Sequence, residues 1–582
     1  MASFGQDTAI RSKIHDDLDL CRLILTAASA SRPLEIRESN IPNAGSGLFT
    51  SAPIPVGVEI FRSSPIVNVR DPSARHVCDW CYTTTPSGID SLGAMAAEQL
   101  GATSIMPPKP TAMLLCSGCK VGRYCSQACQ RNAWKTFHKL ECKAVLSEAP
   151  AMGPTTLAMY RLLLLKKDGR FTERQWKAIM QLESHFEEQN EDLRNDILAK
   201  VHGWGRRMGT DVDFMTVWEL LCIIFTNSMN VRPAEADVSF GTSLDLVVSM
   251  INHDCSPNAH VFFEGSQVRV RSLKAIAAGG EITVSYCDPR LDVLLRQEIL
   301  RQTQFFHCEC TTCNSEYNEH LEASGAANEK DAIRRCEVIL DQQKTMLQVA
   351  GNCTSGFYSV LKGSEAAKTE MLSQFAAAIE TMTKSGYGGH AWPAHVEPLP
   401  NVRMTLAGMF KAGFSYVPAL KYALAGCLMA GRRCGSPFVQ DLLELVRILV
   451  QTCNEPGDGM PFTVQNFPTK KELQMLTMGY IVILCKAVRL AFGTDCRYTL
   501  MVWAWARTFM GAGAGGVPAL GQTVFEEQFE KVQKKLASWA EVDRLLNLGD
   551  RRELVTTVVD VIKAFETYTI KPGIARIRQE LE

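Results

Sequence analysis

Four pairs of cysteine and histidine residues decide the reading of this chain, spaced as Cys78-x2-Cys81, Cys116-x2-Cys119, Cys125-x3-Cys129 and His138-x3-Cys142. Two thiolates two residues apart on a tight turn can bind one metal ion, and so can two ligands three or four residues apart on a helix. Eight ligands in four such pairs therefore predict two tetrahedral Zn2+ sites in which every ligand is used.

The main alternative for these cysteines is a disulfide cluster, which requires an oxidising compartment. A secretory signal would place basic residues and then an apolar stretch near the start of the chain, where Asp16, Asp17 and Asp19 stand instead. The sequence therefore favours zinc. Zinc thiolates, together with the other cysteines among the 21 in the chain, indicate a reducing compartment, and we expect a cytoplasmic and/or nuclear protein.

The residues around these ligands resemble a MYND zinc finger, in particular Tyr124–Gln130 followed by Trp134. The resemblance implies an interleaved pairing of the ligands. The spacing between Cys81 and Cys116 is longer than the family usually has, and we expect an exposed loop there, through Gly88–Gly93 and Pro107–Pro110. One zinc ion would be bound by Cys78, Cys81, Cys125 and Cys129, and the other by Cys116, Cys119, His138 and Cys142.

A second cysteine cluster, Cys308-x-Cys310-x2-Cys313, supplies three thiolates and is one ligand short of a tetrahedral zinc site. Cys255 is the candidate for the fourth ligand. It lies in Ser249-Met250-Ile251-Asn252-His253-Asp254-Cys255-Ser256-Pro257-Asn258, which together with residues 275–286 resembles the core of a SET methyltransferase; the cysteine trio resembles a post-SET element. The chain thus resembles the SET and MYND domain-containing (SMYD-type) protein-lysine methyltransferase family, by motif over residues 32–320.

The length, net charge and apolar runs of the chain restrict its domain number and its binding partners. At 582 residues the chain should form several domains. A net charge of -1 argues against strong nucleic-acid binding, which depends on lysine and arginine neutralising phosphates. The most apolar run, residues 479–484, is too short to span a membrane and is expected to be a buried helix. We expect a monomer.

Patterning and resemblance together predict an α+β multidomain fold. Runs of β-branched residues broken by glycine and proline predict strands within residues 34–69 and 244–284, including one at 244–248. Helical periods fill residues 155–230 and the chain beyond 325. The expected architecture is a split SET β-fold with an inserted MYND zinc finger and a helical insert, followed by an all-α C-terminal domain for which the resemblance implies a tetratricopeptide-like array. The expected segments are an N-terminal helix (1–31), the first part of SET (32–72), the MYND finger (73–145), a helical insert (146–235), the SET core (236–290), the post-SET element (291–324) and the helical domain (325–582).

The resemblance implies a site for S-adenosylmethionine (SAM). Asn252 and His253 match the family's Asn-His pair, which binds the cofactor through side-chain and backbone polar groups. Glycine at position 47 permits a close approach of the backbone to a ligand, and in the family the equivalent turn cradles the methionine end of SAM. Phe306 matches an aromatic that stacks on adenine, for which the alternative is simple packing, and Asn227 resembles a further asparagine that contacts the cofactor. The predicted cofactor-binding residues are Ser46, Gly47, Leu48, Asn227, Asn252, His253, Tyr286 and Phe306.

Tyr286 stands at the position of the family's catalytic tyrosine. Transfer of a methyl group to a lysine requires the amine, with a pKa of about 10.4, to lose a proton, which desolvation in an apolar channel favours. The amine and the methyl group must also be held in line. The resemblance implies that Tyr286 orients them; the alternative is a core tyrosine with a satisfied hydroxyl. The transfer needs no metal, so all three Zn2+ ions are expected to be structural.

The sequence therefore predicts a SAM-dependent protein-lysine N-methyltransferase, acting on histone and/or non-histone substrates, with a MYND protein-interaction module. The alternative is a catalytically silent adaptor in transcriptional regulation, whose MYND module recruits proline-containing peptides. Intact Asn252, His253 and Tyr286 favour the enzyme. The family pattern is not complete, because Gly280 replaces a frequent first glutamate, and Gln304 and Phe305 replace a channel-shaping tyrosine, which leaves the degree of methylation open.

Overall fold

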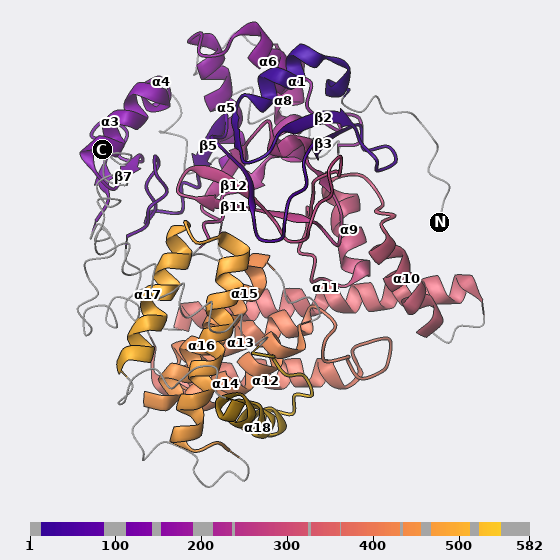
Figure 1. Cartoon of the computed structure of the whole chain (residues 1–582), viewed down its shortest axis with the longest axis vertical. Coiled ribbons are helices and arrows are strands. Elements are labelled where there is room, and N and C mark those ends of the chain that lie inside the picture. Colours follow the sequence, from indigo (N-terminus) through magenta and orange to yellow (C-terminus); the bar gives the residue numbers. More distant parts are fainter. Residues whose placement is uncertain are drawn as a thin grey trace. The chain divides into compact units, whose positions relative to one another are not determined.

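Strand β4 (Glu59–Ser63) lies between β1 (Ala28–Ala30) and β12 (Gln267–Ser272), and β11 (Ala259–Glu264) completes this antiparallel sheet. Segments far apart in the sequence therefore form one sheet (Figure 1). The structure, a computed structural model, describes residues 13–85, 112–142, 153–189, 213–234, 239–323, 328–360, 363–430, 435–454, 467–512 and 523–548.

The chain divides into two units. Among the described residues, the first comprises those within 13–286 and 301–306, and the second those within 287–300 and 307–548. The loop expected at Gly88–Gly93 and Pro107–Pro110 lies outside the described residues. The segment boundaries predicted from the sequence stay predictions.

Smaller sheets of the first unit carry residues that the sequence predicts to bind a cofactor. Strands β2 (Leu34–Glu38) and β3 (Ser46–Thr50) form an antiparallel hairpin. Strands β5 (Val67–Arg70), β9 (Gly241–Leu244) and β8 (Met229–Asn230) form a three-stranded antiparallel sheet. The short strand β10 (Asn252–His253) pairs in parallel with β13 (Thr283–Val284).

Two apolar helices fill the core of the first unit. Helix α5 (Pro154–Lys167) packs against β5 and against α8 (Phe214–Asn227). Helix α8 begins after Asp213, whose carboxylate accepts hydrogen bonds from the backbone N–H groups of Met215 and Thr216. Both helices are apolar on most of their circumference. They are therefore buried on most sides, whereas an amphipathic helix would expose one polar face. The shorter α6 (Glu173–Met180) packs against α8 and α1.

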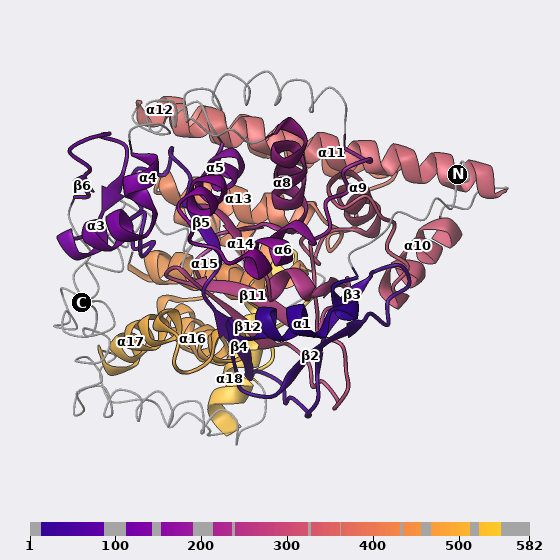
Figure 2. The ribbon, with the colours of Figure 1, turned by 90° about the horizontal axis from the view of Figure 1, so that it is seen from above.

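Two sequence-based expectations were wrong in extent. Helix α1 covers only Leu18–Leu25, beside β2 (Figure 2), and residues 28–30 form strand β1 because their backbone pairs with β4. The strand expected at residues 244–248 ends at Leu244. The Asp245 carboxylate then accepts hydrogen bonds from the backbone N–H groups of Val247 and Val248, which turns the chain into a 3-10 helix, Val248–Met250.

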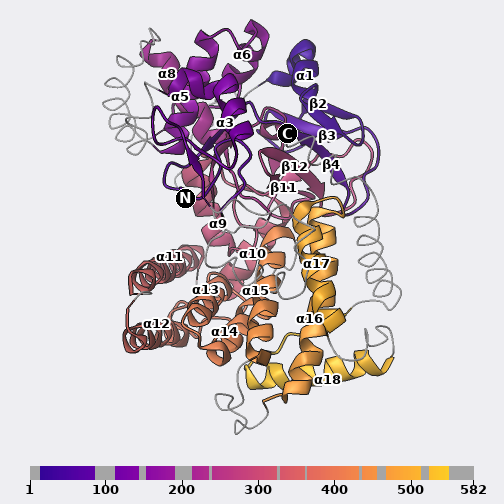
Figure 3. The ribbon, with the colours of Figure 1, turned by 90° about the vertical axis from the view of Figure 1, so that its left-hand side faces the viewer.

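Among the described residues beyond position 293, every regular element is a helix; helices were predicted only for the chain beyond 325. Successive helices pack against one another from α13 to α17, and α11 packs against α12 (Figure 3). The helices are α9 (Val293–Thr303), α10 (Thr311–Ala323), α11 (Glu329–Val360), α12 (Glu365–Ser385), α13 (Leu399–Ala412), α14 (Tyr416–Met429), α15 (Gly435–Asn454), α16 (Lys470–Phe492), α17 (Arg497–Ala512) and α18 (Thr523–Trp539).

Helix α16 is long and apolar enough to cross a membrane by length and composition, with a mean hydropathy of 1.7 over its most apolar window. However, 67% of that window is buried in the fold, and the helix packs against α15, α17 and α18. At Gly479 an added Cβ would lie 2.1 Å from the Phe529 ring. These contacts are those of a central helix in a helical bundle, in agreement with the buried helix predicted at residues 479–484.

Candidate functional site

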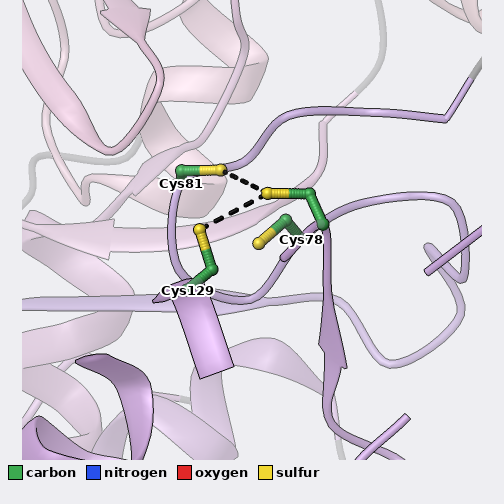
Figure 4. Close-up of side chains that lie close together, drawn as sticks. Cys78, Cys81 and Cys129 are labelled. Atoms are coloured by element: carbon green, nitrogen blue, oxygen red, sulfur yellow. Dashed lines mark hydrogen bonds between the residues drawn. The ribbon is translucent and has the colours of Figure 1, made fainter. Parts of the chain in front are cut away.

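The first predicted zinc group comes together as expected. The sulfur atoms of Cys78, Cys81, Cys125 and Cys129 all lie within 4.8 Å of one another. Figure 4 shows the sulfur atoms of Cys78, Cys81 and Cys129 gathered in one place. The Cys125 sulfur lies 3.4 Å from those of Cys81 and Cys129. Zn–S bonds of about 2.3 Å in a tetrahedron put two sulfurs about 3.8 Å apart, so the group fits zinc after a small expansion.

The second group joins Cys116, Cys119, His138 and Cys142, again within 4.8 Å. The sulfur atoms of Cys116 and Cys142 are 3.7 Å apart, and Nε2 of His138 lies 3.6 Å from the Cys119 sulfur. These are distances between ligands of a tetrahedral zinc site. Burial would raise the pKa of Cys119, but hydrogen bonds, above all the one with His138, lower it to about 6. At neutral pH the sulfur is therefore a thiolate, the form that binds zinc.

A third group of potential zinc ligands contains Cys308, Cys310 and Cys313, whose sulfur atoms also lie within 4.8 Å of one another. The side chain of Gln297 in α9 holds the loop, because it donates to the carbonyl of Cys308 (2.7 Å) and accepts from its N–H (3.0 Å). The predicted fourth ligand, Cys255, is fully buried, and its sulfur lies 3.2 Å from Nε2 of His253. Its role as a ligand stays a prediction.

Two ion pairs, one buried and one partly buried, attach the finger to the rest of the first unit. The guanidinium of Arg70 in β5 binds the Asp79 carboxylate at 2.7 Å, and Asp79 also accepts from the backbone N–H of Arg123 at 2.7 Å. Arg161 in α5 binds both carboxylate oxygens of Glu141, at 2.7 and 2.9 Å. Oε1 of Glu141 also lies 3.5 Å from Nδ1 of His138. Glu141 therefore orients a predicted zinc ligand through the ring nitrogen that faces away from the other ligands.

The predicted cofactor turn at residues 46–48 is instead the start of strand β3, and its residues are buried. The Ser46 hydroxyl lies 3.0 Å from Nδ1 of His15 and accepts from the backbone N–H of His15 at 3.1 Å. The Ser46 side chain is therefore engaged within the protein. Any cofactor contact at Ser46, Gly47 or Leu48 would have to involve the backbone of this strand, and these assignments stay predictions.

The parallel pairing of β10 with β13 brings Asn252, His253 and Tyr286 together. The backbone N–H of Tyr286 donates to Nδ1 of His253 at 2.9 Å, and their rings lie 5.3 Å apart. The hydroxyl of Tyr286 donates to the carbonyl oxygen of Ile251 at 2.8 Å, and the tyrosine is 40% exposed. The Phe306 ring lies 5.8 Å from the His253 ring, so four predicted site residues form one aromatic and polar cluster.

Asn258 locks this arrangement. Its side-chain amide donates to the carbonyl of Glu281 at 2.8 Å, and its amide oxygen accepts from the N–H of Thr283 at 2.9 Å. The position of Asn258 at the end of the Ser249–Asn258 motif thus has a physical role, because this residue ties the motif to β13.

Asn227, another predicted cofactor contact, ends α8 beside the segment that follows α6. Its side-chain nitrogen donates to the carbonyl oxygens of Glu183 (2.6 Å) and Ile223 (2.8 Å). Both amide hydrogens are used within the protein, which is the pattern of a residue that joins two segments. A cofactor contact by Asn227 stays a prediction.

Two residues at this site carried no assigned role in the sequence. Glu281 accepts three hydrogen bonds, from Ser39, Asn40 and Asn252. His15 contacts Ser46. Their partners lie from 29 to 242 positions away in the sequence, and no local pattern marks either residue. The one available signal was that Glu281 follows Gly280, in the segment that resembles a SET motif.

Comparisons with known proteins agree with this geometry. The MYND finger family matches residues 101–142. The human "Histone-lysine N-methyltransferase SMYD3" is 27% identical over 294 residues, which cover 49% of this chain and 62% of that protein. The Arabidopsis thaliana "Histone-lysine N-methyltransferase ASHR1" is 28% identical over 320 residues, covering 50% of this chain and 59% of that protein. The chain therefore spans about three-fifths of the length of these relatives.

A solved structure of Rubisco LSMT bound to AdoMet aligns with 91% of this chain and 94% of that chain, at 10% identity. Its TM-score of 0.26 is too low to relate the two folds in detail.

Proposed function

We propose that this SET and MYND domain protein is a SAM-dependent protein-lysine N-methyltransferase. The observation that carries the proposal is the pairing of β10 with β13, which places Asn252 and His253 beside Tyr286. The matched relatives are named lysine methyltransferases, and each match covers about half of this chain. SAM, when bound, would supply the electrophilic methyl group; the residues below would hold it and the lysine.

Asn252 and His253 would bind the amino-acid and nucleoside parts of the cofactor. Asn252 is half-buried, with its side-chain nitrogen fixed by the carbonyl of Ser46 at 3.0 Å. The half-buried Phe306 would pack on the adenine, because it offers an aromatic face next to His253. A cofactor contact here requires no rearrangement of β10, since that strand is already held by β13.

Tyr286 would orient the lysine. Its hydroxyl proton is donated to the carbonyl of Ile251, so the phenol oxygen faces a substrate as a hydrogen-bond acceptor. An acceptor can hold the N–H of the lysine amine and direct the nitrogen lone pair at the methyl group. Partial exposure of Tyr286 is consistent with access for a protein side chain.

The three cysteine-rich groups would hold structural Zn2+. In the two finger groups all four ligand positions are filled by protein atoms, which leaves no open position for a reacting molecule. Thiolate ligands from loops and short helices make these segments dependent on the metal for folding. The groups therefore shape the protein and take no part in methyl transfer.

The finger would serve as a protein-interaction module. Leu114 and Leu115 in β6 (Leu114–Leu115) and Trp134 are exposed, at 41%, 46% and 44%. Exposed apolar side chains on a small zinc-bound unit suit a peptide partner, and a proline-containing peptide is the one we propose. The same surface would serve the alternative, a silent adaptor. We propose a monomer acting in the cytoplasm and/or nucleus.

Methyl transfer separates the two functions. Purified protein is incubated with methyl-labelled SAM and with histones or a cell lysate, and label on lysine is measured. The enzyme proposal expects label that depends on Tyr286. Thermal stabilisation by SAM without any label in either acceptor set would favour the adaptor.

A further inference from the structure

Glu281 is the most heavily bonded carboxylate at this site. Its Oε1 accepts from the hydroxyl of Ser39 (2.7 Å) and from the side-chain nitrogen of Asn252 (3.0 Å). Its Oε2 accepts from the backbone N–H of Asn40 (2.8 Å). The residue is only 9% exposed. An ionised carboxylate has acceptor sites only, so three converging donors match a carboxylate and would conflict with a neutral amide.

This carboxylate sets the orientation of the Asn252 amide. The two hydrogens on the Asn252 nitrogen are donated to the Ser46 carbonyl and to Glu281 Oε1, both at 3.0 Å. The amide oxygen therefore points the other way. Within the described ranges, no donor of the protein is recorded at that oxygen. Asn252 consequently presents an acceptor, rather than a donor, to a molecule bound beside β10.

Gly47 leaves the space in which Glu281 sits. A Cβ at position 47 would lie 2.5 Å from Glu281 Oε1, which is closer than such atoms approach. The backbone of Glu281 also bridges to Phe49 in β3. Glycine at 47 is thus needed by the carboxylate, whether or not a ligand also approaches the backbone. The carboxylate is held in place before any ligand arrives, because β3, the Ser39–Asn40 loop and β10 all contact it.

We propose that Glu281 is a positioning residue that selects for the α-ammonium group of the cofactor. It turns the Asn252 oxygen toward that ammonium, and its negative charge stabilises the cation at short range in a half-buried site. This inference rests on the proposed function, since it concerns how the same site distinguishes its cofactor. It assigns the methionine end of SAM, rather than the adenine, to the side of Asn252 that faces away from Glu281.

The test compares two ligands by calorimetry: S-adenosylhomocysteine and its analogue that lacks only the α-amino group. The wild-type protein should prefer the amino compound by about tenfold or more, the scale of one hydrogen bond to a charged group. Glu281→Gln should lose most of that preference. The glutamine NH2 group would face the donors of Ser39, Asn40 and Asn252, and the negative charge would be gone. Ser39→Ala is the matched control; it removes one donor from the same carboxylate, spares the Asn252 contact and should keep the preference.

The outcomes are distinct. Equal weakening of both ligands by Glu281→Gln, with the preference intact, would show a merely structural role and overturn the inference. Equal affinity of the wild-type protein for both ligands would overturn it while leaving the proposed function standing. Failure of the wild-type protein to bind either ligand would overturn the proposed function as well. If Glu281→Gln does not fold, Glu281→Asp takes its place; it keeps the charge but not the reach, so the preference should fall between wild type and none.

Discussion

The backbone N–H of Tyr286 donates a hydrogen bond to Nδ1 of His253 over 2.9 Å. Because Nδ1 is the acceptor, the ring proton lies on Nε2, which donates to the sulfur of Cys255 at 3.2 Å. One buried imidazole thus connects the predicted catalytic tyrosine to a predicted zinc ligand. The connection gives His253 a role in placing Tyr286 in addition to any contact with the cofactor.

His253→Phe should lower methyl transfer by about tenfold or more, because the N–H of Tyr286 loses its acceptor while the ring volume is kept. We expect a smaller change in SAM affinity than in turnover. Steady-state kinetics measure both. His260→Phe, a histidine of the same unit that stacks on Phe262 in β11, is the matched control and should retain activity. Unchanged turnover in His253→Phe would contradict the positioning role.

Much of this arrangement could be predicted from local patterns. The ligand spacing predicted two zinc sites, because pairs on turns and helices keep their geometry in any fold. The resemblance to a MYND finger predicted which ligands form the groups around Cys78 and Cys116. The order of strands and helices followed from periodicity. By contrast, Glu281 and His15 act through hydrogen bonds to segments far away in the sequence, which leave no period or spacing to detect.

A hydrogen-bonded turn at Asp245 moved one element boundary away from its predicted position. Asp245 ends the expected strand early because its carboxylate satisfies two backbone N–H groups of the following turn. The residues after Asp245 are apolar through Val248, so hydrophobicity alone favoured a longer strand. The turn matters for the site, since it leads directly into Asn252.

Purified protein should contain three zinc ions per molecule by elemental analysis. Each structural site supplies on the order of 10 kcal/mol of apparent binding free energy, so Cys125→Ser should unfold the finger. Cys255→Ser should remove one zinc ion and leave the finger's two in place. Cys222→Ser, a buried cysteine of α8 outside the three groups, should keep all three. A content of two or fewer in undamaged wild-type protein would refute the assignment of Cys255.

Glu397 should make the helical unit less stable as pH rises. The side chain is 2% exposed, and its Oε1 has no hydrogen-bond partner among the described residues. Burial raises its pKa from 4.5 to about 7; nearby Asp288 and Asp441 add to the rise, and Arg290 opposes it. The folded state therefore favours the protonated acid, and this contribution is full below pH 4.5 and is lost as pH rises through about 7.

Glu397→Gln should abolish that dependence and raise stability above pH 7, by at most about 3 kcal/mol. Chemical denaturation of both proteins from pH 5 to pH 8 measures the difference, and shared effects such as zinc release cancel between them. Glu380→Gln, an exposed position of α12, is the control and should run parallel to wild type. Parallel curves for Glu397→Gln as well would show that its pKa is not raised.

Tyr286→Phe should reduce methyl transfer at least about a hundredfold, the scale of one oriented catalytic group, while SAM affinity stays nearly unchanged. The fold should persist, because Tyr286 is 40% exposed and the substitution keeps the ring while it removes the hydrogen bond to the Ile251 carbonyl. Tyr422→Phe in α14, where the ring stacks on Phe410, is the control and should retain full activity. More than half of wild-type activity in Tyr286→Phe would remove Tyr286 from catalysis.

Mass spectrometry of an acceptor protein after incubation with SAM tests the central claim most directly. The account predicts that wild-type protein adds the mass of one or more methyl groups to a lysine of the acceptor, and that Tyr286→Phe adds almost none under the same conditions. Wild-type protein that carries its full zinc content and binds SAM, yet methylates no lysine in histones or in a whole lysate, would contradict it.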